Sequence, residues 1–146
     1  MRKIFAGLAT LLVLAVVAQF FLAATGAFDT EPNDESFQMH RALGYGILLF
    51  AVVLTLFAAL ARMPGRIIGM AGLAAGLALL QGVIRAVAAA LDDTGGSSSA
   101  GGELVFGLHA VNALVIMALA GMIARQAREL SRPESATAAA PAQQRS

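Results

Sequence analysis

The feature that most constrains this chain is a nearly continuous apolar stretch at residues 37–60, FQMHRALGYGILLFAVVLTLFAAL. About 20 apolar residues are enough to cross the hydrocarbon core of a bilayer as an α-helix. The whole chain of 146 residues is 58% hydrophobic and 13% charged, with a mean hydropathy of +0.76. A soluble domain has roughly 45–50% apolar and about 25% charged residues. We therefore expect an integral membrane protein, with the lipid bilayer as its partner.

The apolar segments predict an all-α membrane four-helix bundle. The expected spans lie at about residues 4–26, 38–61, 67–91 and 104–124. Short connections between long apolar helices favour antiparallel neighbours, so the arrangement is up-down-up-down. We expect residues 1–130 to form this single membrane domain. The remainder, residues 131–146, is rich in Ala, Pro, Ser and Gln and is expected to be a disordered cytoplasmic tail.

The first apolar segment has two interpretations. A basic start followed by an apolar region and the small residues Thr25, Gly26 and Ala27 is typical of a cleaved signal peptide. The apolar run is, however, longer than a signal core and long enough to span a membrane. We favour a retained first helix.

Charge distribution predicts the orientation. The basic residues fall on one side of the predicted bundle: Arg2, Lys3, Arg62, Arg66, Arg125, Arg128 and Arg132. The acidic residues fall on the other side, with Arg41 as the one basic residue among them: Asp29, Glu31, Asp34, Glu35, Asp92, Asp93 and Glu103. Loops rich in Lys and Arg stay in the cytoplasm. Both termini are therefore expected to be cytoplasmic, and the two acidic loops external.

A stripe of glycines runs along the third predicted helix. Gly65, Gly69, Gly72 and Gly76 are spaced by four, three and four residues and share one face. Small residues let membrane helices pack closely. The stripe is interpreted either as intramolecular packing against the second or fourth helix or as the interface of a homo-oligomer.

Polar side chains within the spans are concentrated in their outer halves. They are Gln19, His40, Gln81, Arg85, His109 and Asn112. Polar groups are costly in a bilayer and usually mark a functional site. The inner halves are almost entirely apolar, so the sequence predicts one polar layer near the outer face.

The two histidines suggest a cofactor site within this layer. In an up-down-up-down bundle, His40 and His109 lie on diagonal helices whose axes are roughly 12–14 Å apart. That gap suits a b-type haem, whose iron is commonly held by axial histidines. A small residue, Gly44 or Ala113, follows each histidine by one turn. The predicted site comprises His40, His109 (as iron ligands), Gly44, Ala113, Arg85 (for the propionates), Gln81 and Asn112.

Three other interpretations of the layer remain. It can be purely structural, in a non-catalytic interaction or accessory protein. It can hold another metal ion or a quinone. Arg85 can also bind an anionic molecule in an outward-facing pocket, as in a small-molecule carrier, or pair with a nearby Asp or extend into water.

Several function classes are disfavoured. The net charge of +1 argues against nucleic-acid binding, and the absence of cysteine removes disulfides, thiolate metal sites and covalent haem attachment. No zinc-protease, hydrolase or phosphate-loop motif is present. No acidic residue lies within a span, which argues against a proton-coupled multidrug exporter. The sequence therefore gives no indication of an enzyme.

Three segments carry a resemblance to a known family. HRALGYGILL at 40–49, ARMPGR at 61–66 and GLHAVNALVIMALAG at 107–121 resemble small bacterial four-span proteins grouped as the domain-of-unknown-function 6220 family. The resemblance covers residues 1–130. It implies a multi-pass protein of the bacterial cytoplasmic membrane and no known activity. The histidine and glycine at 40–44 are also similar to patterns in b-type cytochromes and haem-A-synthase-like bundles, although a second histidine pair for a second haem is lacking.

Overall fold

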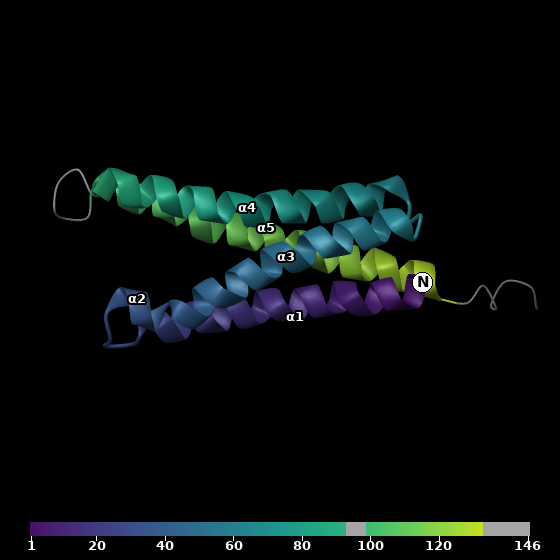
Figure 1. Cartoon of the computed structure of the whole chain (residues 1–146), viewed down its shortest axis with the longest axis horizontal. Coiled ribbons are helices and arrows are strands. Elements are labelled where there is room, and N and C mark those ends of the chain that lie inside the picture. Colours follow the sequence, from purple (N-terminus) through teal and green to yellow (C-terminus); the bar gives the residue numbers. More distant parts are fainter. Residues whose placement is uncertain (93–98, 133–146) are drawn as a thin grey trace, which may run out of the picture.

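The computed structural model describes residues 1–92 and 99–132, in which every regular element is a helix (Figure 1). The elements are α1 (Arg2–Ala27), α2 (Asn33–Ser36), α3 (Gln38–Leu60), α4 (Gly65–Asp92) and α5 (Ala100–Ser131). The four long helices are each long and apolar enough to cross a membrane. The predicted all-α four-helix bundle is therefore confirmed, and its helices are those of a multi-span membrane protein.

The four long helices form a closed ring of neighbours. Contacts join α1 to α3, α3 to α4, α4 to α5, and α5 back to α1. The diagonal pairs, α1 with α4 and α3 with α5, have no backbone contacts among the described residues. The histidine-bearing helices, α3 and α5, are thus diagonal, as predicted.

The tight turn between α3 and α4 is formed by a Schellman motif. Arg62 adopts a left-handed conformation with φ of 50°. The backbone N–H of Met63 donates to the carbonyl of Ala58 (3.0 Å), and that of Arg62 donates to Ala59 (3.0 Å). Pro64 follows directly, and Gly65 already begins α4.

The outer loop between α1 and α3 packs tightly against the end of α1. It was predicted as an irregular polar segment, and it contains the short helix α2. A Cβ atom at Gly26 would lie 2.7 Å from the carbonyl oxygen of Ser36 and 3.1 Å from the Phe37 ring. Gly26 is buried at this approach, so a larger residue there would push the loop away.

The last helix extends beyond its predicted span at both ends. Its N-terminus begins at Ala100 because the hydroxyl of Ser99 accepts a hydrogen bond from the backbone N–H of Gly102 (2.9 Å). At the other end the helix continues past the apolar segment to Ser131. The part of the predicted tail at residues 133–146 lies outside the described residues.

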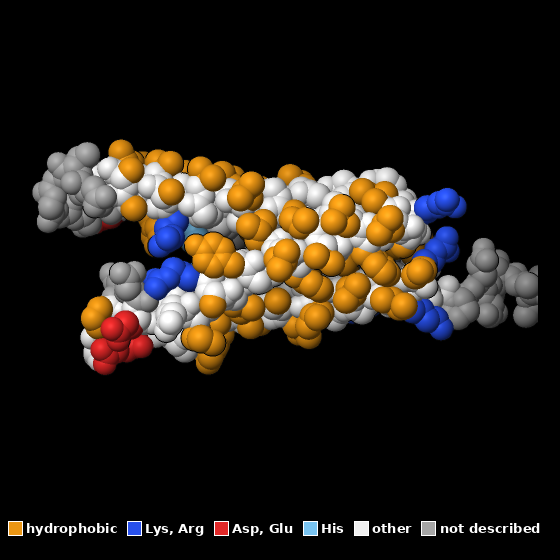
Figure 2. Space-filling model, in the orientation of Figure 1, with side chains coloured by type: hydrophobic (Ala, Val, Ile, Leu, Met, Phe, Trp, Pro, Cys, Tyr) orange, Lys and Arg blue, Asp and Glu red, His pale blue; other side chains and the backbone are white. Residues whose placement is uncertain are grey.

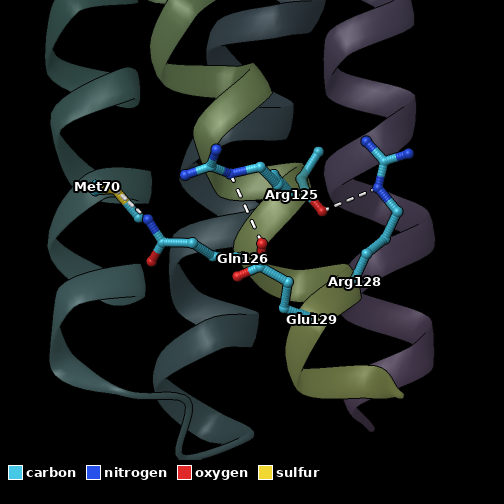
Figure 3. Close-up of polar contacts among 6 residues, drawn as sticks. Met70, Arg125, Gln126, Arg128 and Glu129 are labelled. Carbon is cyan, nitrogen blue, oxygen red and sulfur yellow. Dashed lines mark hydrogen bonds and ion pairs between the residues drawn. The ribbon is translucent and has the colours of Figure 1, made fainter.

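Polar contacts stabilise this C-terminal extension of α5 (Figure 3). Arg125 and Glu129 form an exposed ion pair at 3.8 Å, and the guanidinium of Arg128 donates to the carbonyl of Ala124 (3.2 Å). Gln126 turns towards α4 and donates to the sulfur of Met70 at 3.8 Å. Two of these contacts join residues four apart on α5, and the third joins α5 to α4. They support the helix beyond its predicted apolar span.

Small residues dominate the packed core, which is densest in the inner half of the bundle. Ala9, Ala58, Ala120, Ala124 and Ala127 are fully buried there. The largest fully buried side chains fit between these alanines: Phe5, Leu12, Leu54, Ile67 and Ile123. Close helix approach through small residues provides the van der Waals contact that holds helices together in lipid.

Charge is separated along the bundle axis (Figure 2). Lys and Arg side chains gather at the end that holds the N-terminus, and the acidic side chains visible in this view gather at the opposite end, where some Lys or Arg side chains also lie. Hydrophobic side chains cover the sides between them. This separation agrees with the pattern from which the orientation is predicted, and the orientation itself stays a prediction.

The glycine stripe is largely unused within the bundle. A Cβ at Gly72 would lie 3.7 Å from the Thr55 methyl group of α3, but one at Gly65, Gly69 or Gly76 would meet nothing within 4 Å. Intramolecular packing therefore accounts for Gly72 alone. The homo-oligomer stays a prediction.

Candidate functional site

The polar residues predicted from the sequence form one layer in the outer half of the bundle. His40 of α3 and His109 of α5 approach each other across the diagonal, with ring centroids 6.2 Å apart and ring planes inclined by 50°. Both imidazoles are half-buried. The layer thus brings together two side chains from helices that have no backbone contact with each other.

His40 is held by Gln19 of α1. The imidazole Nδ1 lies 3.1 Å from the main-chain oxygen of Gln19, and because a carbonyl only accepts, Nδ1 carries the hydrogen. His40 Nε2 then has a lone pair, towards which the Gln19 amide nitrogen lies at 3.3 Å. The same amide donates to the main-chain carbonyl of His40 at 2.8 Å. This is the arrangement that fixes the tautomer of a metal-binding histidine.

His109 is anchored by a second set of amides. Gln81 of α4 donates to the main-chain carbonyl of His109 at 3.1 Å. Asn112, which is only 8% exposed, donates to the Gln81 side-chain oxygen at 3.0 Å and to the carbonyl of Leu77 at 2.9 Å. The amides join α4 to α5 at the level of the imidazole, so Gln81 and Asn112 lie where the sequence predicted but bind protein groups.

The two halves of the layer repeat one pattern. In each helical hairpin, a glutamine on the first helix donates to the main-chain carbonyl of the histidine on the second. In each, a phenylalanine three residues before the histidine touches its ring: Phe37 meets His40 edge-on at 6.0 Å, and Phe106 stacks on His109 at 5.4 Å. The site is therefore built from two similar hairpins, α1–α3 and α4–α5, that meet at the imidazoles.

Two buried polar atoms of the layer have no hydrogen-bond partner among the described residues. They are His109 Nδ1 and the side-chain oxygen of Gln19. A buried polar group without a partner costs free energy, and such atoms are rare in folded proteins. Both atoms lie at the imidazole pair, since His109 is one of its two members and Gln19 contacts the other, His40.

The space next to Gly44 is already occupied. A Cβ at this position would lie 3.1 Å from the Gln19 amide nitrogen. The sequence interpretation was that Gly44 and Ala113 leave room for a flat cofactor, but beside Gly44 that room accommodates Gln19. Gln19 was placed in the polar layer from sequence and not in the site, because spacing alone does not show which face of α1 meets His40.

Arg85 lies at the edge of the layer. It lines an open hollow of about 260 Å³ together with Ala88, Ala89, Gly102, Glu103 and Phe106. No hydrogen bond or ion pair joins Arg85 to another residue of the described chain. The ring of Phe106 connects the hollow to His109, on which it stacks.

The ligand count narrows the choice of metal centre. Within the described ranges no group of three or more His, Asp or Glu side chains converges. Protein zinc sites use three or four protein ligands. Haem brings four nitrogen ligands of its own and needs only one or two axial side chains. Two facing imidazoles therefore suit haem iron better than a bare ion.

Comparison with known proteins supports the family resemblance. Residues 19–89 match the model of a family described as a family of unknown function (DUF6220). The matched segment includes Gln19, His40, Gly44, Gln81 and Arg85 and ends before α5. No curated protein and no solved structure matches the chain. The match supports the resemblance over residues 19–89, which contain the motif segments at 40–49 and 61–66, whereas the segment at 107–121 lies outside it; the family description assigns no activity.

Proposed function

We propose that this small membrane protein, whose residues 19–89 match a family of unknown function, is a cytochrome-like module that binds one b-type haem between α3 and α5. His40 and His109 would hold the haem iron. The observation that carries the proposal is the imidazole pair: two rings from diagonal helices lie 6.2 Å apart in a layer that contains an unpartnered imidazole nitrogen.

The separation of the two rings fits a single metal ion. A bond between a metal ion and an imidazole nitrogen is about 2.0–2.1 Å, so two nitrogens bound to one ion can lie up to about 4 Å apart. The ring centres lie further out than the nitrogens, which makes 6.2 Å a suitable distance. His40 also has its Nε2 lone pair available, because Nδ1 donates to Gln19. If haem bound, Nε2 of His40 would hold the iron and would lose its weak contact with the Gln19 amide.

Bound haem would supply one-electron chemistry, and the chain would position and insulate it. The imidazole pair lies in the outer half of the bundle, and no second histidine pair exists in the sequence. An electron would therefore enter and leave near the outer face. Transfer across the whole membrane would require a partner protein.

The alternative function is that of an interaction or accessory protein in which the polar layer only fixes helix register. The contacts of Gln19 favour this alternative, because its amide fills the space beside Gly44 and bonds His40. Polar contacts between membrane helices typically contribute about 0.6 kcal/mol each and specify how helices align.

A reduced-minus-oxidised absorption spectrum of the protein purified in mild detergent tests the proposal. Haem ligation predicts an α-band that His40→Ala and His109→Ala each abolish. Gln126→Ala is the matched control for His109→Ala, because Gln126 is also a half-buried polar residue of α5 but lies in the inner half. This variant should keep the full α-band.

The same spectra separate the two functions. A wild-type protein without an α-band, even after haem is added during purification, rejects the haem proposal. If the histidine variants then only lower the unfolding midpoint, the layer is structural. An α-band that survives both histidine variants would mean that haem binds elsewhere.

A further inference from the structure

Arg85 is a charged residue in a membrane-spanning helix without a partner in the described chain. It lies one turn from Gln81 on α4, towards the outer end, and makes no hydrogen bond or ion pair with the described residues. An arginine within a span is costly and usually pairs with an anionic group or faces a polar cavity. Its position next to the imidazole layer therefore calls for a counter-ion.

The hollow beside Arg85 is large enough for one end of a ligand but too small to enclose a whole drug-sized molecule. Its volume is about 260 Å³, and pockets that enclose drug-sized molecules are roughly 300–1,000 Å³. The apolar part of its lining consists of small residues and Phe106, whose ring also stacks on His109. A flat ligand beside His109 would extend along Phe106 into the hollow.

Basic side chains are present on both hairpins at the outer end of the bundle. In Figure 2, Lys or Arg side chains lie on either side of a hollow at the acidic end of the bundle. The described basic residues of that end are Arg41 of α3 and Arg85 of α4; Arg85 lines the 260 Å³ hollow, and Arg41 does not. The other charged lining residue, Glu103, is exposed in the first turn of α5, where a helix N-terminus stabilises a carboxylate.

We propose that Arg85 and its hollow bind the carboxylate end of the haem, with the guanidinium pairing to a propionate. This inference rests on the proposed haem function and adds the residue that sets the orientation of the ring. A guanidinium binds a carboxylate through two parallel hydrogen bonds, which fixes geometry as well as charge. The propionates would point to the outer face, and the apolar edge of the ring would point into the bundle.

Binding of haem and of its dimethyl ester to the full-length protein in detergent tests this inference. The ester has the same ring and iron but no carboxylates. The wild type is expected to bind haem about tenfold more tightly than the ester, since hydrogen bonds to charged groups are among the stronger ones. Arg85→Gln should lose this preference and bind both equally, whereas Arg85→Lys should keep part of it.

Arg66→Gln is the matched control, because Arg66 is an exposed arginine of the same helix at the opposite end. It should keep the full preference for haem over the ester. Equal binding of both compounds by the wild type overturns the role of the carboxylates while leaving the haem function intact. An undiminished preference in Arg85→Gln overturns the role of Arg85. Binding of neither compound by the wild type rejects the haem function and this inference together.

Discussion

At the scale of single residues, the layer depends on how Gln19 fits beside Gly44. The Gln19 amide joins α1 to α3 through the carbonyl and the ring of His40. It reaches this position because Gly44 has no side chain, and a Cβ there would lie 3.1 Å from the amide nitrogen. The glycine and the glutamine therefore act as a pair that sets the position of the imidazole.

Gly44→Ala should displace Gln19 and weaken the contact between α1 and α3. Gly46→Ala is its control, since a Cβ at Gly46 meets nothing within 4 Å on the same helix. Replacing a helical glycine by alanine normally stabilises a helix by about 0.5–1 kcal/mol. We expect Gly44→Ala to be about 1 kcal/mol less stable than Gly46→Ala because it loses a hydrogen bond of ordinary strength. Detergent-based unfolding midpoints measure the difference, and equal midpoints would contradict it.

At the scale of helices, α5 is packed through alanines against α1 and α4. Ala120, Ala124 and Ala127 are completely buried on this helix, while Ala118 is exposed. The buried alanines set how closely the helices approach. A larger side chain on this face has no space to enter without moving a neighbouring helix.

Ala124→Leu is therefore expected to destabilise the bundle by about 1–3 kcal/mol, the usual cost of overpacking a core. Ala118→Leu makes the same chemical change on the exposed face of α5 and should leave stability nearly unchanged. Unfolding of both variants in mixed micelles, followed by circular dichroism, gives the comparison. Equal stability of the two leucine variants would show that α5 does not pack as described.

The sequence was sufficient to predict these helices but not all of their limits. Apolar run length located the spans, because the bilayer sets a minimum length that hydropathy reveals. The run stops before Arg125, yet α5 continues to Ser131, since Ala127 and Leu130 still pack on the core and the Arg125–Glu129 pair lies on the exposed face. Likewise, the hydroxyl of Ser99 caps α5, so the helix begins at Ala100, before the predicted span at 104–124.

The candidate site was also predictable only in part. The diagonal placement of His40 and His109 follows from helix order alone, so the sequence predicted it. The contacts of Gln19 depend on the rotation of α1 about its axis, which a nearly uniformly apolar helix does not encode. For the same reason the sequence did not reveal that Gln81 and Asn112 bond each other and the backbone.

At the scale of the whole molecule, the bundle consists of two similar hairpins with different surfaces. The hairpins contribute equivalent glutamine, phenylalanine and histidine residues to the layer. The second hairpin differs in having a row of glycines on α4. A Cβ at Gly65, Gly69 or Gly76 of this row would meet no atom of another helix within 4 Å. These glycines contribute little to the monomer, so a role for them would require a second molecule.

The homo-oligomer predicted from this row can be tested without disturbing the monomer. Gly69→Leu adds a side chain where nothing lies within 4 Å, so the bundle should fold normally. A dimer that packs backbone to backbone through this face would be blocked, because leucine separates the helices. Gly82→Leu is the control, since Gly82 is equally open on α4 but lies outside the glycine row. Blue-native electrophoresis should show dimers for the wild type and Gly82→Leu and monomers for Gly69→Leu; a monomeric wild type, or a Gly69→Leu variant that still dimerises, would remove this interface.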